Sequence, residues 1–474
     1  MGVKDLAENS RAWEVRVPPA ELKRPYEVQE VLRRDPVPPA PTLLEKSDYD
    51  LGTGPLDVER YISREFHARE VDKLWSKAWQ YAVWTHDIPN PGDVHVYRIV
   101  DRSVLIVRQP DLSLKAFVNS CLHRGTELCK SDTHRAQLRC PYHGFTWSLQ
   151  GELKWVPSQW DFPQVTPEKY SLPQVRVDEW NGFIFINFDE NAVPLKEYMG
   201  GMYAQWGGEH PQGAWDFRSK YKAVHLNRII NCNWKVCMEG FLESLHVLAT
   251  HPQVATMVAD SSAQYDVYPN EPHFSRYHAL TGIASSMTHN VPTDQEILDS
   301  FTASYLPEHR NTDFGKLREG ETARMAFGRL ARDAYGTRLG VDVSKLPDAE
   351  LIDGTQYLLF PNFAPWPSLL NPIVYRFRPL NSDPDWSIWE TMFFLPFEGD
   401  RPPSCKIIDV GPNESFEDYN AMGALDKILQ QDAMQLPLVQ RGLKASSVKR
   451  VTLSQYQEAR IRHYNQTLDE YLKR

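Results

Sequence analysis

The chain has 474 residues, 42% of them hydrophobic and 24% charged, which is ordinary for a soluble globular protein of two or three domains. Its net charge of −10 and the lack of a long basic run argue against nucleic acid as a partner. No apolar run approaches the ~18 residues of a membrane span, and residues 1–9 lack a secretory signal's apolar stretch, so we expect a cytoplasmic protein without membrane contact.

The first 55 residues are expected to form an arm. A short charged stretch, 26–34, can be helical, and the proline-rich segment 35–41 should be extended. Such an arm either wraps a neighbouring subunit or is a partly disordered tail. The next segment, 56–81, is predicted to be one helix over 57–79 that packs on the C-terminal domain, because its apolar residues form an imperfect stripe.

Residues 82–188 are predicted to be a small all-β domain, which we call the cluster region. From Val94 onward the hydrophobic period changes to the alternation of strands, and the segment Gly182–Asn187 is strongly β-prone. The predicted strands cover 94–99, 104–107, 115–119 and two strands within 175–188.

Two short cysteine–histidine pairs lie inside the cluster region. They read Cys121-Leu-His123 and Cys140-Pro-Tyr-His143, with sixteen residues between His123 and Cys140. Two thiolates and two imidazoles in this pattern indicate a Rieske [2Fe–2S] cluster, in which two Cys hold one iron and two His hold the other. The alternative is a structural zinc site, but zinc motifs more often have two-to-four-residue gaps in both pairs.

Residues that flank these pairs support the cluster. Gly125 and Gly144 suit loops whose backbone amides must approach the cluster sulfurs closely. Arg124 and Arg139 lie beside the ligands, where they either position an electron donor or a subunit interface, or are simply solvated cations.

Residues 189–474 are predicted to be an α+β domain, with strands packed under helices. Residues 253–350 are polar, irregular and helix-containing, and are expected to form a long lid over the active site. The predicted strands cover 356–360, 373–378 and 388–395, and helices are predicted over 416–436, ended by Pro437, and over 452–473.

A second set of candidate ligands lies in a helix predicted over 234–248. Glu243 and His246 share a helix face, whereas His246 and His251 are about 140° apart on a regular helix. The helix must therefore distort or end between the two histidines, and Pro252 disfavours the α region at His251. The alternative for this pair is two ordinary buried or capping histidines.

Two histidines and one carboxylate form the facial triad of non-heme Fe(II) oxygenases. The best third ligand is Asp432, in the setting Gln-Gln431-Asp432, and Asp426 is the runner-up.

The two motifs, in this order, resemble the large (α) subunit of Rieske non-heme iron ring-hydroxylating oxygenases over residues 56–445. The resemblance implies a Rieske domain followed by a catalytic domain with a helix-grip-like antiparallel sheet. It also implies that His246, His251 and Asp432 hold a mononuclear iron. Glu243 would be the bridging carboxylate, which hydrogen-bonds an iron-ligating histidine and a cluster histidine of the neighbouring subunit.

The sequence departs from the family pattern at two positions. The family often has Glu-Asn-Phe where this chain has Glu239-Gly240-Phe241. Many members have Asp where this chain has Glu243, although the family's quaternary-ammonium oxygenases also have Glu.

The resemblance implies an oxygenase component that uses O₂ and external electrons to mono- or dioxygenate an aromatic or other apolar ring compound, as in aromatic hydrocarbon catabolism. The sequence has no Gly-rich dinucleotide fingerprint, so electrons should come from a separate NAD(P)H-dependent reductase, a ferredoxin or both. A homotrimer, with or without a small β subunit, is expected.

Two alternative functions stay open. The first is a monooxygenase or demethylase of a quaternary ammonium or methoxy-aromatic substrate. The second is a Rieske electron-transfer protein without catalysis, against which the second ligand set argues.

Overall fold

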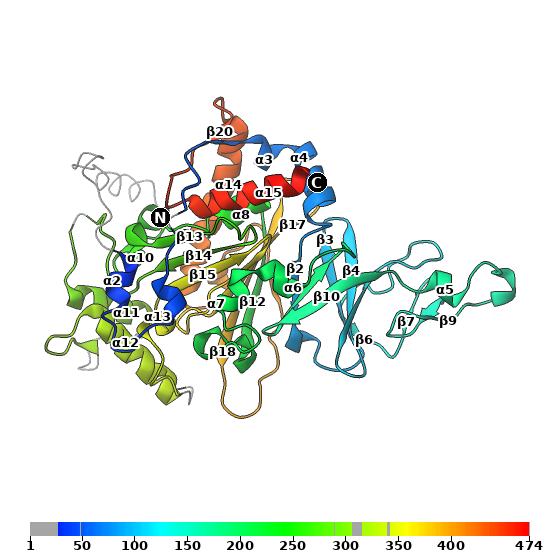
Figure 1. Ribbon diagram of the computed structural model, residues 1–474, viewed down its shortest axis with the longest axis horizontal. Coiled ribbons are helices and arrows are strands. Elements are labelled where there is room, and N and C mark those ends of the chain that lie inside the picture. The colour runs from blue at the N-terminus through cyan, green and yellow to red at the C-terminus, as the bar shows by residue number, and fades with distance from the viewer. Residues whose placement is uncertain (1–26, 48, 289, 306–314, 339–341, 474) are drawn as a thin grey trace.

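The computed structural model describes residues 27–47, 49–288, 290–305, 315–338 and 342–473. A large body carries a narrow extension at one end, formed by the tip of the cluster region, while helices α14 (Ala424–Ala445) and α15 (Ala459–Lys473) are both seen at the top of the body in Figure 1. Among the described residues, no helix combines the length and apolar character that a membrane span requires.

The cluster region is built on a seven-stranded sheet with the order β2-β11-β10-β5-β4-β3-β6. All of its pairings are antiparallel, and the strands predicted for this region are confirmed. A three-stranded sheet, β7-β8-β9, forms the projecting tip together with α5 (Pro167–Tyr170) (Figure 1). The strands are β2 (Gln80–Trp84), β3 (Asp93–Ile99), β4 (Arg102–Arg108), β5 (Leu114–Val118), β6 (Thr133–His134), β7 (Leu138–Arg139), β8 (Thr146–Trp147), β9 (Leu153–Trp155), β10 (Gln174–Trp180) and β11 (Phe183–Asn187).

The C-terminal region has an eight-stranded sheet with the order β13-β14-β15-β16-β17-β18-β12-β19. Every pairing is antiparallel except the one between β12 and β19. Helices α8 (Trp234–Glu239) and α15 pack on the sheet and α14 packs against α8, so the predicted α+β class is confirmed. The strands are β12 (Lys220–Ile230), β13 (Gln264–Val267), β14 (Phe274–Ala279), β15 (Gly354–Leu359), β16 (Phe363–Pro365), β17 (Ile373–Pro379), β18 (Ser387–Pro396) and β19 (Ile408–Val410).

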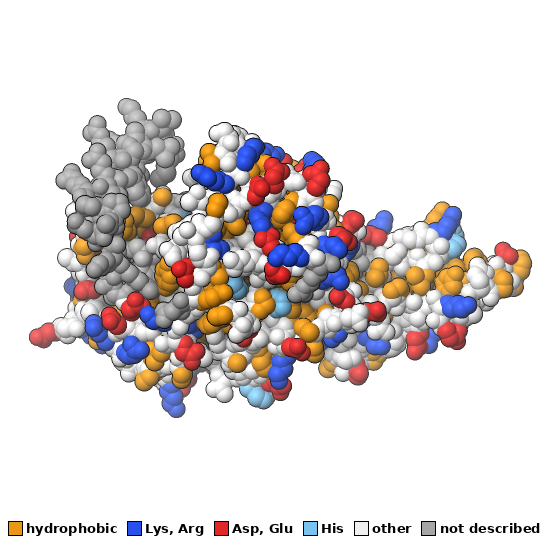
Figure 2. Space-filling model, turned by 45° about the horizontal axis from the view of Figure 1, so that its top comes forward, with side chains coloured by type: hydrophobic (Ala, Val, Ile, Leu, Met, Phe, Trp, Pro, Cys, Tyr) orange, Lys and Arg blue, Asp and Glu red, His pale blue; other side chains and the backbone are white. Residues whose placement is uncertain are grey.

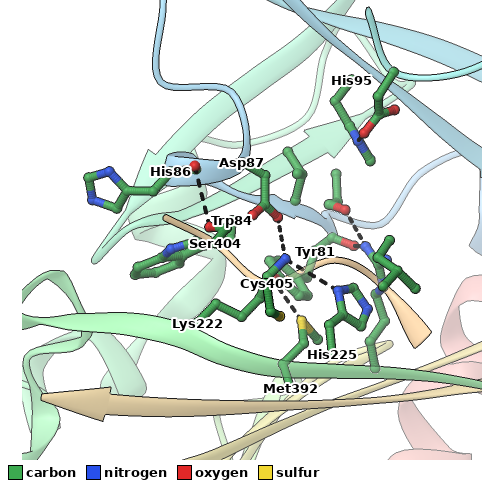
Figure 3. A pocket seen from close by; sticks show the side chains of 15 residues that line it. Tyr81, Trp84, His86, Asp87, His95, Lys222, His225, Met392, Ser404 and Cys405 are labelled. Carbon is green, nitrogen blue, oxygen red and sulfur yellow. Dashed lines mark hydrogen bonds and ion pairs between the residues drawn. The ribbon is translucent and has the colours of Figure 1, made fainter. Parts of the chain in front are cut away.

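The two large sheets share a core and a polar junction. Buried rings of the smaller sheet, such as Phe183, pack against Phe363 and Phe394 of the larger one. Beside this core lies a cavity of about 320 Å³ in which Lys222 of β12 points toward Asp87, with 2.5 Å between Nζ and Oδ2 (Figure 3). The same ammonium lies 3.3 Å from Nδ1 of His225. Burial, aided by the charge of Lys222, lowers the pKa of His225 to about 4, so this histidine is neutral and can accept that hydrogen bond.

The prediction of one helix over 57–79 is wrong. The segment is divided into α3 (Glu59–Ile62), α4 (Arg64–Arg69) and a π-helical turn over Glu70–Leu74. Ser63 breaks it, because its backbone is extended and its hydroxyl accepts a hydrogen bond from the amide of Phe66, as an N-cap does.

The prediction that 253–350 is an irregular lid is also wrong in part. Strands β13 and β14 of the main sheet lie inside this range and were not expected. The expected helices are present as α11 (Asp294–Tyr305), α12 (Ala323–Asp333) and α13 (Asp348–Leu351). The polar composition misled because the strands bury ion pairs, such as Asp266 with Arg276 at 2.8 Å.

Helix α14 does not end at Pro437 but passes through it to Ala445. Beyond the proline, buried Gln440 ties the helix to its surroundings. Its Oε1 accepts from the amide of Asn233, and its Nε2 donates to the carbonyl of Tyr61 and to Asp385. These contacts hold the helix in place beyond Pro437 and so offset the loss of the backbone bond that a proline removes.

The predicted C-terminal helix begins at Ala459 rather than at 452. The residues before it include strand β20 (Arg450–Val451), which pairs with β1 (Leu56–Asp57). This pairing joins the segment that precedes the cluster region to the segment that follows α14.

The described part of the arm packs on its own chain, so the alternative of a disordered tail is wrong over residues 27–47, and α2 (Val28–Leu32) confirms the helix expected within 26–34. Contact of the arm with a neighbouring subunit stays a prediction. Val28 and Leu32 of α2 (Val28–Leu32) are fully buried in the main core. Both carboxylate oxygens of Asp35 accept hydrogen bonds from Arg324 of α12, at 2.8 and 2.6 Å. The rest of the predicted arm, residues 1–26, lies outside the described residues.

Candidate metal centres

The two cysteine–histidine loops have the same backbone. The amide of Cys121 donates to the carbonyl of Thr126 and the amide of Gly125 to that of Cys121, at 2.9 and 2.8 Å. In the second loop, Cys140 and Gly144 repeat these bonds at 2.8 and 3.0 Å. Gly125 and Gly144 both have a φ of +81°, a left-handed conformation that favours glycine.

The two loops place the two cysteines next to each other and the two histidines next to each other. The thiols of Cys121 and Cys140 are buried side by side, and burial together with the Cys140 thiol raises the pKa of Cys121 to about 11. The rings of His123 and His143 lie 4.7 Å apart. Nδ1 of His123 is buried without a hydrogen-bond partner among the described residues, as a ligand atom would be. The donor set therefore fits a [2Fe–2S] cluster with two thiolates on one iron and two imidazoles on the other.

The two arginines beside the loops contact aromatic and ligand side chains. The guanidinium of Arg124 lies 2.7 Å from Nε2 of His143 and 4.8 Å from the ring centre of Tyr142. Arg139 lies over the ring of Trp155 at 5.7 Å. Of the two, Arg124 touches a candidate cluster ligand directly.

His246, His251 and Asp432 come together, with their nearest ligand atoms all within 4.8 Å of one another. Oδ1 of Asp432 lies 2.9 Å from Nε2 of His251 and 3.7 Å from Nε2 of His246. The runner-up, Asp426, does not join them, and its carboxylate accepts from the amide of Met422 instead. Two imidazoles and one carboxylate on one side of an ion leave positions for other ligands.

The local backbone differs from the single helix that was predicted over 234–248. Helix α8 (Trp234–Glu239) ends before the ligands, and His246 is the N-cap of a separate turn, α9 (Val247–Thr250). His251 has φ −125° and ψ 57°, outside the α region, and α10 (Pro252–Ala255) follows it. The predicted effect of Pro252 on His251 is thus confirmed, and the rings of His246 and His251 lie 5.2 Å apart.

Each histidine is oriented by a side chain behind it. Nδ1 of His246 donates to Oε1 of Glu243 at 2.7 Å, and Nδ1 of His251 donates to Oε1 of Gln431 at 2.8 Å. Both bonds leave Nε2 as the free ligand atom that faces Asp432. Gln431 was not among the predicted site residues; its only signal is its position next to Asp432.

Charge around His246 is strongly negative. Although burial disfavours the imidazolium, the charge and hydrogen bond of Glu243 and the charge of Asp432 outweigh it and raise the pKa of His246 to about 9. A site that stabilises a proton on this ring in the absence of metal also stabilises a divalent cation in its place.

Two cavities meet at two of the three candidate iron ligands, His246 and Asp432. The cavity that we call the inner cavity has a volume of about 160 Å³ and is bounded by the aromatic rings of Phe241, Tyr277, Trp366 and Tyr375. The outer cavity, of about 370 Å³, is bounded by Glu239 and Glu458 and by the exposed side of α14. Both include Gly240, where the family often has Asn, as well as Glu243, His246 and Asp432.

Exposed apolar side chains gather at two places. On the projecting tip, which carries hydrophobic side chains in Figure 2, Tyr142, Trp155 and Trp160 are exposed, the last by 83%. In the second group, Val439 lines the outer cavity, and Leu245, Met434 and Leu438 are the chain neighbours of its lining residues His246, Gln435 and Val439. Exposed apolar groups of this kind mark surfaces that meet other proteins.

Two family models match the chain. One, described as Rieske [2Fe-2S] domain, matches residues 78–166, and the other, described as ring hydroxylating alpha subunit (catalytic domain), matches residues 212–474.

Among curated relatives, the benzene 1,2-dioxygenase subunit alpha of Pseudomonas putida is 28% identical over 213 residues, which are 44% of this chain and 47% of that protein. The carnitine monooxygenase oxygenase subunit of Acinetobacter baumannii is 27% identical over 240 residues, which are 50% of this chain and 62% of that protein. The aligned part thus spans about half the length of these relatives.

Solved structures share the fold over most of the chain. Naphthalene 1,2-dioxygenase with indole bound in the active site has a TM-score of 0.60 at 18% identity and covers 89% of this chain and 92% of its own. A quaternary ammonium Rieske monooxygenase in complex with L-carnitine has a TM-score of 0.58 at 18% identity and covers 89% and 96%. Arene and quaternary-ammonium oxygenases are therefore both similar to this chain.

Proposed function

Because the chain belongs to the family of ring-hydroxylating oxygenase alpha subunits, and contains a Rieske domain as well, we propose that it is the terminal oxygenase of a ring-hydroxylating system. Members of this family bind a Rieske [2Fe–2S] cluster and a mononuclear iron and use O₂ as oxidant. The observation that carries the proposal is that the fold assembles both donor sets, and that an apolar cavity lies against the second one. We assign residues 82–188 to the Rieske unit and 189–474 to the catalytic unit.

In the proposed mechanism, Cys121, Cys140, His123 and His143 hold the cluster, and His246, His251 and Asp432 hold the iron. When bound, the two groups store electrons and activate O₂. Glu243 and Gln431 fix the tautomers of the iron-site histidines, and the apolar wall of the inner cavity excludes water from the reacting ring.

The inner cavity favours an uncharged aromatic substrate with one ring. Its volume of about 160 Å³ is close to that of the ~150 Å³ apolar cavity known to bind benzene. No described residue on its wall is Lys or Arg, so the carboxylate of a benzoate or of a carnitine would be buried without a counter-charge. Its two acidic side chains, Glu243 and Asp432, are both engaged by histidines. We therefore favour an arene over a quaternary ammonium compound.

We further propose a head-to-tail homotrimer. The candidate cluster ligands lie next to the strands β7 and β8 of the projecting tip, whereas the candidate iron ligands lie in the body, where Asp432 belongs to α14 itself (Figure 1). Docking the exposed aromatic tip of one subunit on the apolar rim of the next subunit's outer cavity would bring its cluster close to Glu243. Such a heterologous contact closes into a ring when the rotation allows it. Family members work with a separate reductase or ferredoxin, which would donate electrons to the cluster.

A single turnover tests the oxygenase proposal. The chemically reduced protein, loaded with both iron centres, is mixed with O₂ and toluene, anisole, benzoate or a trimethylammonium compound, while cluster absorbance and products are measured. We expect an uncharged arene to accelerate cluster reoxidation and to yield a hydroxylated product. If no compound gives product, or if His246→Ala gives as much product as the unaltered chain, the oxygenase proposal is wrong and electron transfer alone remains.

A further inference from the structure

Three charged side chains form a buried network beside the inner cavity, and one of them comes from the N-terminal arm. Nε and Nη2 of Arg324 donate to the two carboxylate oxygens of Asp35, at 2.8 and 2.6 Å. Nη1 and Nη2 of the same guanidinium donate to the two carboxylate oxygens of Asp353, at 2.6 and 2.9 Å. The three side chains are at most 6% exposed. One guanidinium thus lies between two carboxylates, and loss of either one leaves buried donors unpaired.

This network holds the backbone of Thr281, a residue of the inner cavity wall, on both sides. The amide of Thr281 donates to Oδ1 of Asp353 at 2.8 Å, and its carbonyl accepts from Nη1 of Arg324 at 3.1 Å. Asp353 also immediately precedes Gly354, which lines the same cavity. Two buried charges therefore fix the cavity wall at this point.

Helix α12, which carries Arg324, packs directly against the residue that follows Thr281. Gly282 has a φ of +80°, and a Cβ added to it would lie 2.5 Å from Cα of Arg324. At so close an approach, Arg324 and the wall segment have no free space between them. A shift of Arg324 is therefore passed to Thr281.

The side chain of Thr281 is free to bind a molecule in the cavity. Its Oγ1 makes no hydrogen bond to the residues that the structure describes, yet it is not sealed from solvent as Nε1 of Trp366 is. Because Thr281 as a whole is only 6% exposed and lines the inner cavity, the accessible side of this hydroxyl faces that cavity. By contrast, the hydroxyl of Ser244 on the same wall already bonds Tyr265 and the carbonyl of Asp260.

We propose that Asp35 of the arm is a positioning residue of the substrate site, and that Thr281 is the residue it positions. Acting through Arg324 and Asp353, Asp35 holds the hydroxyl of Thr281 where it bonds a neutral polar substituent on the ring of the substrate. A threonine hydroxyl can donate one hydrogen bond and accept others, so it pairs with the hydroxyl of a phenol but not with the methyl group of toluene. The inference rests on the proposed function, because it adds two residues to that substrate site.

The buried charges have a physical reason in this arrangement. A buried ion pair costs desolvation and adds little stability over apolar residues of similar volume. A hydroxyl whose backbone is fixed before the ligand arrives, however, loses less conformational freedom when it bonds that ligand. The network therefore favours selective binding rather than stability of the fold.

The test is a double-mutant cycle on ligand binding. The full chain, loaded with both iron centres and kept without O₂, is titrated by calorimetry with phenol and with toluene, which have nearly the same size. We expect Thr281→Val, which keeps the shape of the side chain, to lower the preference for phenol over toluene about fivefold, as the loss of one hydrogen bond does. Asp35→Asn should lower this preference about threefold, but should lower it no further in Thr281→Val.

The matched control is Glu30→Gln, which removes one negative charge from an exposed position of the arm in α2. It should leave both dissociation constants unchanged. Circular dichroism checks the folding of every variant. If Asp35→Asn does not fold, Asp35→Glu, which keeps the charge but moves it by one methylene, takes its place in the cycle.

A purely structural role of Asp35 would weaken both ligands alike, and an unchanged ratio of the two constants in Asp35→Asn overturns the proposal. So does an unchanged ratio in Thr281→Val, an equal effect of Asp35→Asn in both backgrounds, or no binding of either ligand. Products are then measured after reduction and addition of O₂. If the cycle gives the expected ratios but neither ligand is oxidised, the proposed function fails and the positioning role stands. If both are oxidised but the ratios do not change, the reverse holds.

Discussion

The two metal-binding regions of this chain assemble their ligands by different routes. In the cluster region, two loops with the same hydrogen bonds and the same left-handed glycine each contribute one Cys and one His. In the catalytic region, His251 meets Asp432, which is 181 residues away, only because α14 packs beside the loop that carries the histidines. The first site is therefore a property of local sequence, whereas the second depends on the packing of the whole domain.

The largest effect should come from removing one ligand of each site. We expect His246→Ala to lower product formation by about 10³-fold or more, because the iron loses one of three ligands, while cluster absorbance is unchanged. Conversely, Cys140→Ser should abolish cluster absorbance and retain iron at His246. Metal analysis and visible spectra of the purified variants check both. Loss of the cluster in His246→Ala would show that the two sites do not assemble independently.

The candidate iron site of the catalytic region should show its own dependence of stability on pH. When its mononuclear iron is removed by a chelator, protonated His246 stabilises the fold, because its pKa of about 9 lies above the ordinary value of 6.5. This contribution, on the order of 3 kcal/mol, is complete below pH 6.5 and is lost as the pH rises through 9. Urea unfolding at pH 6, 7.5 and 9 measures it. Glu243→Gln should flatten the dependence, and an equally steep slope in this variant would contradict the assignment.

The contact between Gln431 of α14 and His251 tests whether the packing of α14 orients the histidines of the iron site. Gln431→Leu removes the acceptor that fixes the tautomer of His251, so Fe(II) affinity should fall about 10–100-fold. Gln430→Leu is the matched control, because this neighbour on α14 bonds the amide of Phe416 and not a histidine. Anaerobic Fe(II) titration distinguishes them, and equal losses in both variants would mean that general damage to α14 is responsible.

The smallest expected effect is a difference in thermal stability between glycine variants of the two cluster loops. Gly125→Ala and Gly144→Ala meet the same left-handed backbone, which costs about 1 kcal/mol for a residue other than glycine. Only at position 144 would the new Cβ also lie 3.3 Å from Arg139 and Trp155; at 125 the nearest atom is 3.9 Å away. Thermal loss of cluster absorbance should therefore occur earlier in Gly144→Ala. Identical curves would show that the loops tolerate this crowding.

The sequence and the family resemblance predicted the candidate ligand residues of both sites, and the structure brings His246, His251 and Asp432 together as expected. The sequence did not predict that α8 ends at Glu239, because the residues that follow have no strong helix breaker apart from Gly240. Gln431 escaped notice because a polar residue on a helix is ordinarily solvated. Strand β12 was not predicted because its pairing with β18 stabilises it, and a sequence pattern does not show such a partner. The continuation of α14 through Pro437 was not predicted for the same reason, because it depends on contacts such as the one between Asn233 and Gln440.

The pairing of β1 with β20 has a consequence for the order in which the centres form during synthesis. It makes the cluster region an insertion within the catalytic domain, enclosed by segments that meet only when residue 451 has been made. All strands of the seven-stranded sheet are present once Asn187 has left the ribosome, whereas Asp432 follows roughly 10 to 50 s later at about 5–20 residues per second. We therefore expect nascent chains to acquire their iron–sulfur cluster before the iron site exists.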